Sequence, residues 1–236
     1  MPKDNYPPIP LRLSNDPAAS LHILTCGYGL GFLVETRAGL YLIDCGTPGH
    51  EKVVFEKMRE LGRNDLRLIW ITHAHYDHYG SAARLRELTI AKIGAHPLDA
   101  DDMIHARSRL GSPRSYGGIY FALQPLVAFG RRLEPTPPDF TLEDGETLER
   151  FGPEATILHT PGHTPGHTSV VLGGGTAFAG DLLGGFPKPA LQSLLATEWD
   201  ALPASLEHLK AAKPERVFTG HRHKPVSGEE LQAISW

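Results

Sequence analysis

The sequence has little that would place the protein in a membrane, in a secretory pathway or on a nucleic acid. No apolar run reaches the length of about eighteen residues that a transmembrane helix needs. Residues 1–15 are rich in proline and polar groups and lack the apolar stretch of a secretory signal. The net charge of −4 gives no basic excess for contact with a phosphate backbone. We therefore expect a cytoplasmic protein with no membrane or nucleic-acid partner.

Cysteine is also scarce. The two cysteines, Cys26 and Cys45, lie on early segments that are predicted to pair as neighbouring strands. A disulfide between them is disfavoured in a reducing cytosol, so both are predicted to be buried free thiols. The chain of 236 residues, with 41% hydrophobic residues, suffices for one large domain or two small ones.

Residues 73–78 concentrate metal-binding side chains more than any other part of the chain. Their sequence is His73-Ala74-His75-Tyr76-Asp77-His78, and it directly follows an apolar run, residues 68–72, that is typical of a buried strand. Imidazole and carboxylate groups are suitable ligands for zinc, iron or manganese. Side chains two apart in an extended backbone point the same way, so His73 and His75 can bind one ion while Asp77 and His78 turn toward another.

Three more ligand-type residues also follow predicted strands. His163 lies in a loop stiffened by proline and glycine, Asp181 ends the run Ala179-Gly180-Asp181, and His221 follows Thr219-Gly220. Open α/β sheets commonly place their sites at strand ends. The sequence therefore predicts that these residues complete a metal site with residues 73–78.

The ordered motifs HxHxDH, TPGHT, AGD and TGH resemble those of the metallo-β-lactamase superfamily, over roughly Cys26 to His221. An aspartate in the third motif is similar to the glyoxalase II and lactonase branches. The resemblance implies an α/β (α+β) fold, a four-layer αβ/βα sandwich, and a single domain over residues 1–236. It also implies that Asp44, which follows an early strand, supports the metal loop.

The resemblance further implies a ligand set for two divalent ions, with zinc preferred and manganese or iron as alternatives. His73, His75 and His163 would bind the first ion, Asp77, His78 and His221 the second, and Asp181 would bridge both. Asp77 would also act in catalysis by orienting the attacking hydroxide. Asp44 and His167 would support the ligands through hydrogen bonds.

The remaining pattern alternates strands and helices. Strands are predicted at residues 21–25, 31–36, 39–44, 68–72, 92–95, 156–159, 169–172, 176–179 and 216–219. Helices are predicted at residues 48–61, 80–88, 98–109, 119–129, 203–212 and 227–234.

A long insertion, residues 97–140, is predicted to form a lid or a wall over the substrate. Residues 182–191 are predicted to form the opposite wall. Candidate substrate contacts are Tyr76, Tyr116, Tyr120, Phe186 and His223, although His223 could equally face water.

The leading functional prediction is a dinuclear metallohydrolase that uses a bridging hydroxide to attack a small ester, lactone or thioester. The partner would be a small-molecule substrate, and a homodimer is left open. One alternative is an oxidoreductase similar to the persulfide dioxygenases, which use a single iron. The acidic charge disfavours the other, a phosphodiesterase or nuclease.

Overall fold

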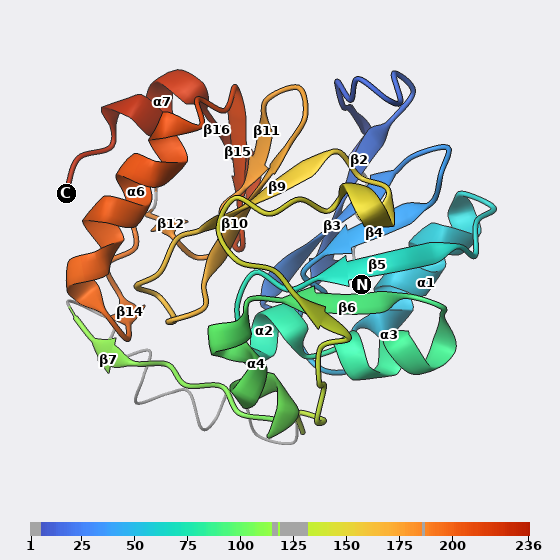
Figure 1. Ribbon diagram of the computed structural model, residues 1–236, viewed down its shortest axis with the longest axis horizontal. Coiled ribbons are helices and arrows are strands. Elements are labelled where there is room, and N and C mark those ends of the chain that lie inside the picture. Colours follow the sequence, from blue (N-terminus) through green and yellow to red (C-terminus); the bar gives the residue numbers. More distant parts are fainter. Residues whose placement is uncertain (1–5, 115–117, 119–131, 186) are drawn as a thin grey trace.

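Two β-sheets face each other at the centre of the computed structural model, which describes residues 6–114, 118, 132–185 and 187–236 (Figure 1). The first sheet has the strand order β1-β2-β3-β4-β5-β6-β8. Its strands are β1 (Ile9–Pro10), β2 (Ser20–Cys26), β3 (Gly29–Glu35), β4 (Leu40–Ile43), β5 (Leu66–Trp70), β6 (Lys92–Ala95) and β8 (Phe140–Thr141). Pairing is antiparallel from β1 to β4 and parallel from β4 to β8.

The second sheet has the order β16-β15-β11-β10-β9. It consists of β9 (Ala155–His159), β10 (Thr168–Leu172), β11 (Thr176–Phe178), β15 (Arg216–Thr219) and β16 (Arg222–Ser227). Two short pairs lie beside it: β12 (Leu183–Gly184) with β13 (Ala190–Leu191), and β14 (Leu195–Ala196) with β7 (Ser112–Pro113).

Helices cover the outer faces of both sheets (Figure 1). The helices beside the first sheet are α1 (Glu51–Glu60), α2 (Tyr76–Tyr79), α3 (Ala82–Leu88) and α4 (Pro97–Ile104). The second sheet carries α6 (Leu202–Ala211) and α7 (Gly228–Ala233), and short 3₁₀ helices lie at η1 (Glu149–Phe151) and η2 (Trp199–Ala201). The four layers form the αβ/βα sandwich of the metallo-β-lactamase type.

Three hydrophobic cores separate the four layers, and alternation along the strands assigns side chains to them. In β5, Trp70 packs between the sheets with Phe32 and Phe178, whereas Ile69 packs outward with Val54 of α1. The second sheet has its own outer core with α6 and α7. Strands buried on both faces have continuous apolar sequences rather than alternating ones.

One predicted helix is shorter in the structure. The helix predicted over residues 98–109 ends at Ile104, because Ala106 has a positive φ of 52° and the Arg107 N–H bonds back to Asp102 O at 2.8 Å. This is the left-handed ending common at helix C-termini. The helix predicted over residues 119–129 lies outside the described residues. Strand β16 was not predicted, and Pro225 is one reason, since proline argues against a strand.

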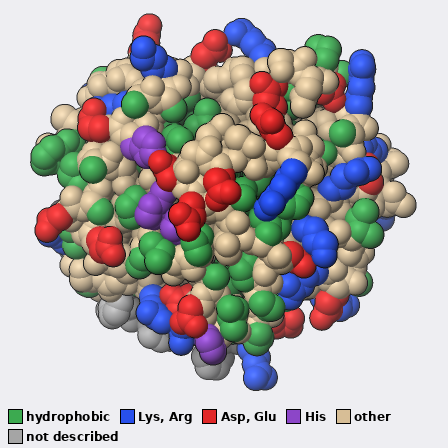
Figure 2. Space-filling model, viewed as in Figure 1, with side chains coloured by type: hydrophobic (Ala, Val, Ile, Leu, Met, Phe, Trp, Pro, Cys, Tyr) green, Lys and Arg blue, Asp and Glu red, His purple; other side chains and the backbone are tan. Residues whose placement is uncertain are grey.

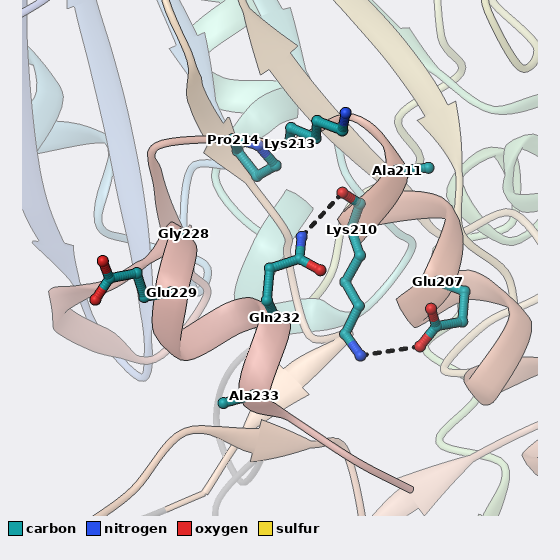
Figure 3. Close-up of a pocket in the computed structure, with 9 residues that line it drawn as sticks. All are labelled: Glu207, Lys210, Ala211, Lys213, Pro214, Gly228, Glu229, Gln232 and Ala233. Carbon is teal, nitrogen blue, oxygen red and sulfur yellow. Dashed lines mark hydrogen bonds and ion pairs between the residues drawn. The ribbon is translucent and has the colours of Figure 1, made fainter.

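The surface shows no large area of one charge in the view of Figure 2, where acidic, basic and apolar side chains are interspersed. Two contacts join side chains that line a hollow between α6 and α7 (Figure 3). Lys210 Nζ forms an ion pair with Glu207 Oε1 at 2.9 Å, and Gln232 Nε2 donates to the Lys210 backbone carbonyl at 3.1 Å. Among the described residues, no helix has the length and apolar character to cross a membrane.

Cys26 and Cys45 are buried free thiols, as predicted.

Candidate metal centre

Three imidazoles converge at the ends of strands from both sheets. His73 and His75 follow β5, and His163 lies in the loop after β9. The Nδ1 atom of His75 lies 3.1 Å from His73 Nε2 and 2.9 Å from His163 Nε2. All three side chains are almost completely buried. Three ring nitrogens this close form a ready set of ligands for one cation.

A second set of ligand atoms lies beside the first. It contains Asp77, His78 and His221, whose ligand atoms lie within 4.8 Å of one another. His75 has an extended backbone, and α2 begins at the next residue, so Asp77 and His78 lie on the first turn of this helix. The His78 ring also lies 4.0 Å from the His73 ring, so the two sets adjoin. His221 arrives from the tight turn between β15 and β16, with Nε2 at 3.6 Å from Asp77 Oδ2.

Asp181 lies between the two sets. Its Oδ2 is 3.5 Å from His163 Nε2 and 3.1 Å from His221 Nε2, and its Oδ1 is 3.5 Å from His78 Nε2. The atoms Asp181 Oδ1 and His78 Nε2 are both buried without a hydrogen-bond partner within the described structure. Buried polar atoms normally have partners, so these orphaned atoms fit the coordination of a cation.

The opposite ring nitrogens of the histidines are fixed by oxygen acceptors. His75 Nε2 lies 2.9 Å from Arg109 O, His163 Nδ1 lies 2.9 Å from Leu195 O, and His221 Nδ1 lies 2.9 Å from Tyr28 O. An N–H donated to each carbonyl makes the inward nitrogen the one that can offer a lone pair to a metal ion. This is the tautomer that a metal-binding histidine requires.

Asp44 fixes the outward ring nitrogen of His78 directly and that of His73 through Thr72. Its Oδ2 accepts hydrogen bonds from His78 Nδ1 at 2.8 Å and from the Thr72 hydroxyl at 2.7 Å, and its Oδ1 accepts the Thr72 N–H at 2.8 Å. The Thr72 hydroxyl in turn lies 3.1 Å from His73 Nδ1. Asp44 adopts a positive φ of 55°, which aspartate tolerates better than most residues.

His167 has both ring nitrogens occupied by the protein. Its Nδ1 lies 3.0 Å from Thr160 O, and its Nε2 accepts the Asp181 backbone N–H at 3.1 Å. His167 therefore positions Asp181 and leaves no nitrogen for an ion.

The comparison with known families agrees with this geometry, since residues 24–221 match the model of the metallo-beta-lactamase superfamily. The chain belongs to the metallo-β-lactamase superfamily. Members of this superfamily are mostly metal-dependent hydrolases, which makes an enzyme with divalent metal ions the general interpretation of the site.

Individual relatives support the same assignment. The chain is 30% identical to the uncharacterized protein YobT of Bacillus subtilis (strain 168) over 210 residues, covering 80% of this chain and 81% of that protein. It is similar to the solved structure of TTHA1623 in a di-iron-bound form, at 29% identity and a TM-score of 0.66, covering 91% of this chain and 98% of that one. The metallo-beta-lactamase family protein TTHA1429 of Thermus thermophilus shares the fold, at 24% identity and a TM-score of 0.68, covering 92% and 79%.

Asp99 on α4 is a site residue that the sequence did not reveal. Its Oδ2 accepts hydrogen bonds from the Ala74 N–H at 2.8 Å and the Thr164 hydroxyl at 2.7 Å, and its Oδ1 accepts the Gly166 N–H at 2.7 Å. The carboxylate thus joins the loop of His73 and His75 to the loop of His163. The sequence offered one signal for Asp99. It lies four residues before the apolar Met103, which places both on the same face of a helix, and both are buried.

Substituting Asp99 with alanine is expected to destabilise the metal-free protein by about 3–5 kcal/mol, because three buried donors would lose a charged acceptor. Urea unfolding of the metal-free variant measures this change. The matched control is Asp101→Ala on the same helix, whose ion pair with Arg107 is exposed and should contribute little to stability. Equal losses in the two variants would contradict a joining role for Asp99.

The electrostatics differ between the two sets of ligands. Burial, followed by repulsion from neighbouring imidazoles, holds the pKa of His73 and of His163 well below the ordinary value. Burial also acts on His78 and His221, but Asp181 outweighs it and raises the pKa of His78 well above its usual range and the pKa of His221 to about 9. Burial opposes the charge of Asp181, yet His221 and His78 hold the pKa of that carboxyl well below its usual range.

These opposite shifts predict different proton release when zinc binds. At pH 7, His73 and His163 are already neutral in the metal-free protein, whereas His78 and His221 carry protons that a metal ion must displace. Filling the second set should therefore release roughly two protons per ion at pH 7, and fewer as the pH rises through about 9, where His221 deprotonates unaided.

Calorimetric zinc titrations in buffers of different ionisation enthalpy measure this release. His221→Ala should release about one proton fewer at pH 7 than the wild type. An unchanged proton count in that variant would contradict the assignment of the proton to His221.

A cleft of about 590 Å³ opens over the two sets of ligands. Besides His75, Asp77, His163, Asp181 and His221, its lining includes Leu110, Leu183, Gly184, Gly185, Gln192, Ser193, Leu194, Leu195, Thr219 and Arg222. Leu110 comes from the predicted insertion, and residues 183–185 come from the predicted opposite wall. Both segments therefore reach the cleft.

The predicted substrate contacts fall in different places. Tyr76 is buried at the start of α2 and does not line the cleft. The His223 side chain lines a different hollow, beside Ile9 and Ile23. Its Nε2 lies 2.9 Å from Thr25 Oγ1, and its ring stacks on Tyr6 with the ring centroids 5.0 Å apart. The structure therefore does not bring His223 to the cleft over the ligand sets. Tyr116, Tyr120 and Phe186 lie outside the described residues.

Proposed function

We propose that this protein is a dinuclear metallohydrolase that cleaves a small ester, lactone or thioester. The observation that carries the proposal is Asp181, whose carboxylate lies 3.1–3.5 Å from three imidazole nitrogens that belong to both ligand sets. A carboxylate in that position can bind two ions at once, as a bridging ligand must. Each set also has three protein ligand atoms of its own.

Two bound divalent ions would supply a nucleophilic hydroxide near neutral pH and polarise the carbonyl that is attacked. The residues of the chain hold and orient this machinery. Asp44, Arg109 O, Leu195 O and Tyr28 O hold the outward nitrogens of the histidines, so the inward nitrogens face the site before an ion binds. We assign Asp77 a second role, in which its carboxylate accepts a hydrogen bond from the attacking water and orients it.

The cleft supports a small-molecule substrate. Its volume of about 590 Å³ is within the usual range for ligand pockets. Leucines from three segments, Leu110, Leu183 and Leu194, form its apolar walls. We propose that the insertion and the loop after Asp181 act as the two walls that select the substrate.

The metal content tests the proposal against mononuclear iron chemistry. We expect about two ions per chain, with zinc as the first candidate, when protein purified without added metal or chelator is measured by plasma mass spectrometry. The di-iron-bound form of the relative TTHA1623 supports two ions and makes iron the main alternative metal. One iron per chain, with oxygen consumption on a persulfide, would overturn the dinuclear hydrolase.

A substrate panel completes the test. The loaded protein should hydrolyse simple esters, lactones or thioesters faster than phosphodiesters at pH 7. Hydrolysis of phosphodiesters alone would replace the proposed reaction with a phosphodiesterase.

A further inference from the structure

Two buried polar atoms at the cleft remain unexplained once the metal ligands are assigned. Within the described part of the chain, Thr219 Oγ1 and Arg222 Nε are buried and lack hydrogen-bond partners. The orphaned atoms His78 Nε2 and Asp181 Oδ1 are accounted for by the ions, but neither a hydroxyl nor a guanidinium is a suitable cation ligand here. A buried hydroxyl without a partner costs free energy, which predicts a ligand that pairs with it.

The two side chains are neighbours in space. Thr219 ends β15 and Arg222 begins β16, and the two residues pair directly across the turn that presents His221. Both line the cleft, and Thr219 is only 1% exposed. Directly opposed residues of an antiparallel pair lie on the same face, so their polar groups can act together on one ligand.

The rest of the Arg222 side chain is fixed by the wall of the cleft. Its Nη1 donates to Gly185 O at 2.5 Å, and its Nη2 lies 3.4 Å from Pro187 O. These bonds hold the guanidinium while the Nε–H stays unpaired. Arg222 is also the only lysine or arginine among the described residues that line the cleft.

We propose that Thr219 and Arg222 form a subsite for a carboxylate that the substrate carries in addition to its scissile ester, lactone or thioester group. The Thr219 hydroxyl and the Arg222 Nε–H would each donate to one carboxylate oxygen, and hydrogen bonds to an ionised group are the strong ones. The carbon chain between the two groups would pack on Leu183 and Leu194. This inference rests on the proposed hydrolase function and names its substrate class.

Thr219→Val is the sharpest test, because valine keeps the shape of threonine and removes only the hydroxyl. The zinc-loaded enzymes are compared on phenyl hydrogen glutarate and phenyl pentanoate, which differ in the terminal carboxylate. The wild type should prefer the glutarate ester, and the variant should lose about tenfold or more of that preference in kcat/KM. The variant should also unfold at the same temperature or higher, since an unpaired buried hydroxyl is removed.

Arg222→Gln and Lys224→Gln form a matched pair, because each removes one positive charge from β16. Lys224 lines a different hollow, beside Tyr6 and Ile23. We expect the preference for the glutarate ester to fall in Arg222→Gln and to stay at the wild-type value in Lys224→Gln. If the preference fell equally in the two variants, it would depend only on long-range electrostatics, and the subsite would be overturned.

Binding provides a readout that does not depend on turnover. Calorimetry on zinc-loaded protein should show tighter binding of glutarate than of pentanoate, and Thr219→Val should abolish the difference. If Thr219→Val lost as much affinity for pentanoate as for glutarate, Thr219 and Arg222 would bind the carboxylate that hydrolysis produces. That result would contradict the proposal. Hydrolysis of both esters without preference overturns the subsite but not the hydrolase, whereas selective glutarate binding without hydrolysis of any ester overturns only the hydrolase.

Discussion

Asp181→Ala is expected to lower kcat/KM by roughly 10²- to 10³-fold and to leave about one metal ion per chain. The Asp181 carboxylate lies 3.1–3.5 Å from nitrogens of both ligand sets, so its removal should weaken both. The loss corresponds to about 3–4 kcal/mol of transition-state stabilisation, within the range expected when one ion of a pair is lost. Steady-state kinetics and plasma mass spectrometry on the same preparation measure the two effects.

Two further variants separate the bridge from a general loss of charge. Asp200→Ala removes an exposed carboxylate from η2 and should keep full activity and metal content. Asp181→Asn keeps the size of the side chain but weakens one ligand oxygen, so we expect an intermediate metal content. Full activity in Asp181→Ala would refute the bridging role.

Asp44→Asn is expected to weaken metal binding by about 10- to 100-fold, although Asp44 is not itself assigned as a ligand. The asparagine amide would place a donor opposite His78 Nδ1 or the Thr72 hydroxyl, where the carboxylate now accepts from both at 2.7–2.8 Å. Because His78 would lose its charged partner, the metal-free protein should also lose about 3 kcal/mol of unfolding free energy. Asparagine tolerates the positive φ at this position, so backbone strain does not account for the loss.

The matched control for Asp44 is Asp16→Asn. Asp16 is another buried loop carboxylate, and it accepts backbone N–H groups from Ala18 and Arg37 far from the ligand sets. This control should lose stability and keep the wild-type affinity for zinc, measured by competition with a chelator. Equal affinity for zinc in Asp44→Asn and the wild type would show that Asp44 does not orient His78.

Most elements of the fold could be predicted from short-range patterns. Apolar runs such as residues 68–72 mark strands because a buried strand needs apolar side chains on both faces. The helix after Ser227 begins with a capping box that includes Glu230, and the sequence alone contains that signature. The end of α4 was predicted five residues too late, since the left-handed turn at Ala106 carries no glycine signal and serves to bring Arg109 O to His75.

The sequence by itself determined the type of chemistry, because the identity of a ligand is a property of its side chain. Four histidine- or aspartate-bearing strand ends were enough to predict a metal site and its members. Only the tertiary structure decided how the site is held together. The acceptors at Arg109, Leu195 and Tyr28 are backbone carbonyls, which every residue has, and Asp99 acts on loops 25 to 67 positions away. Their roles depend on which segments the fold brings together, and no local pattern of residues encodes that.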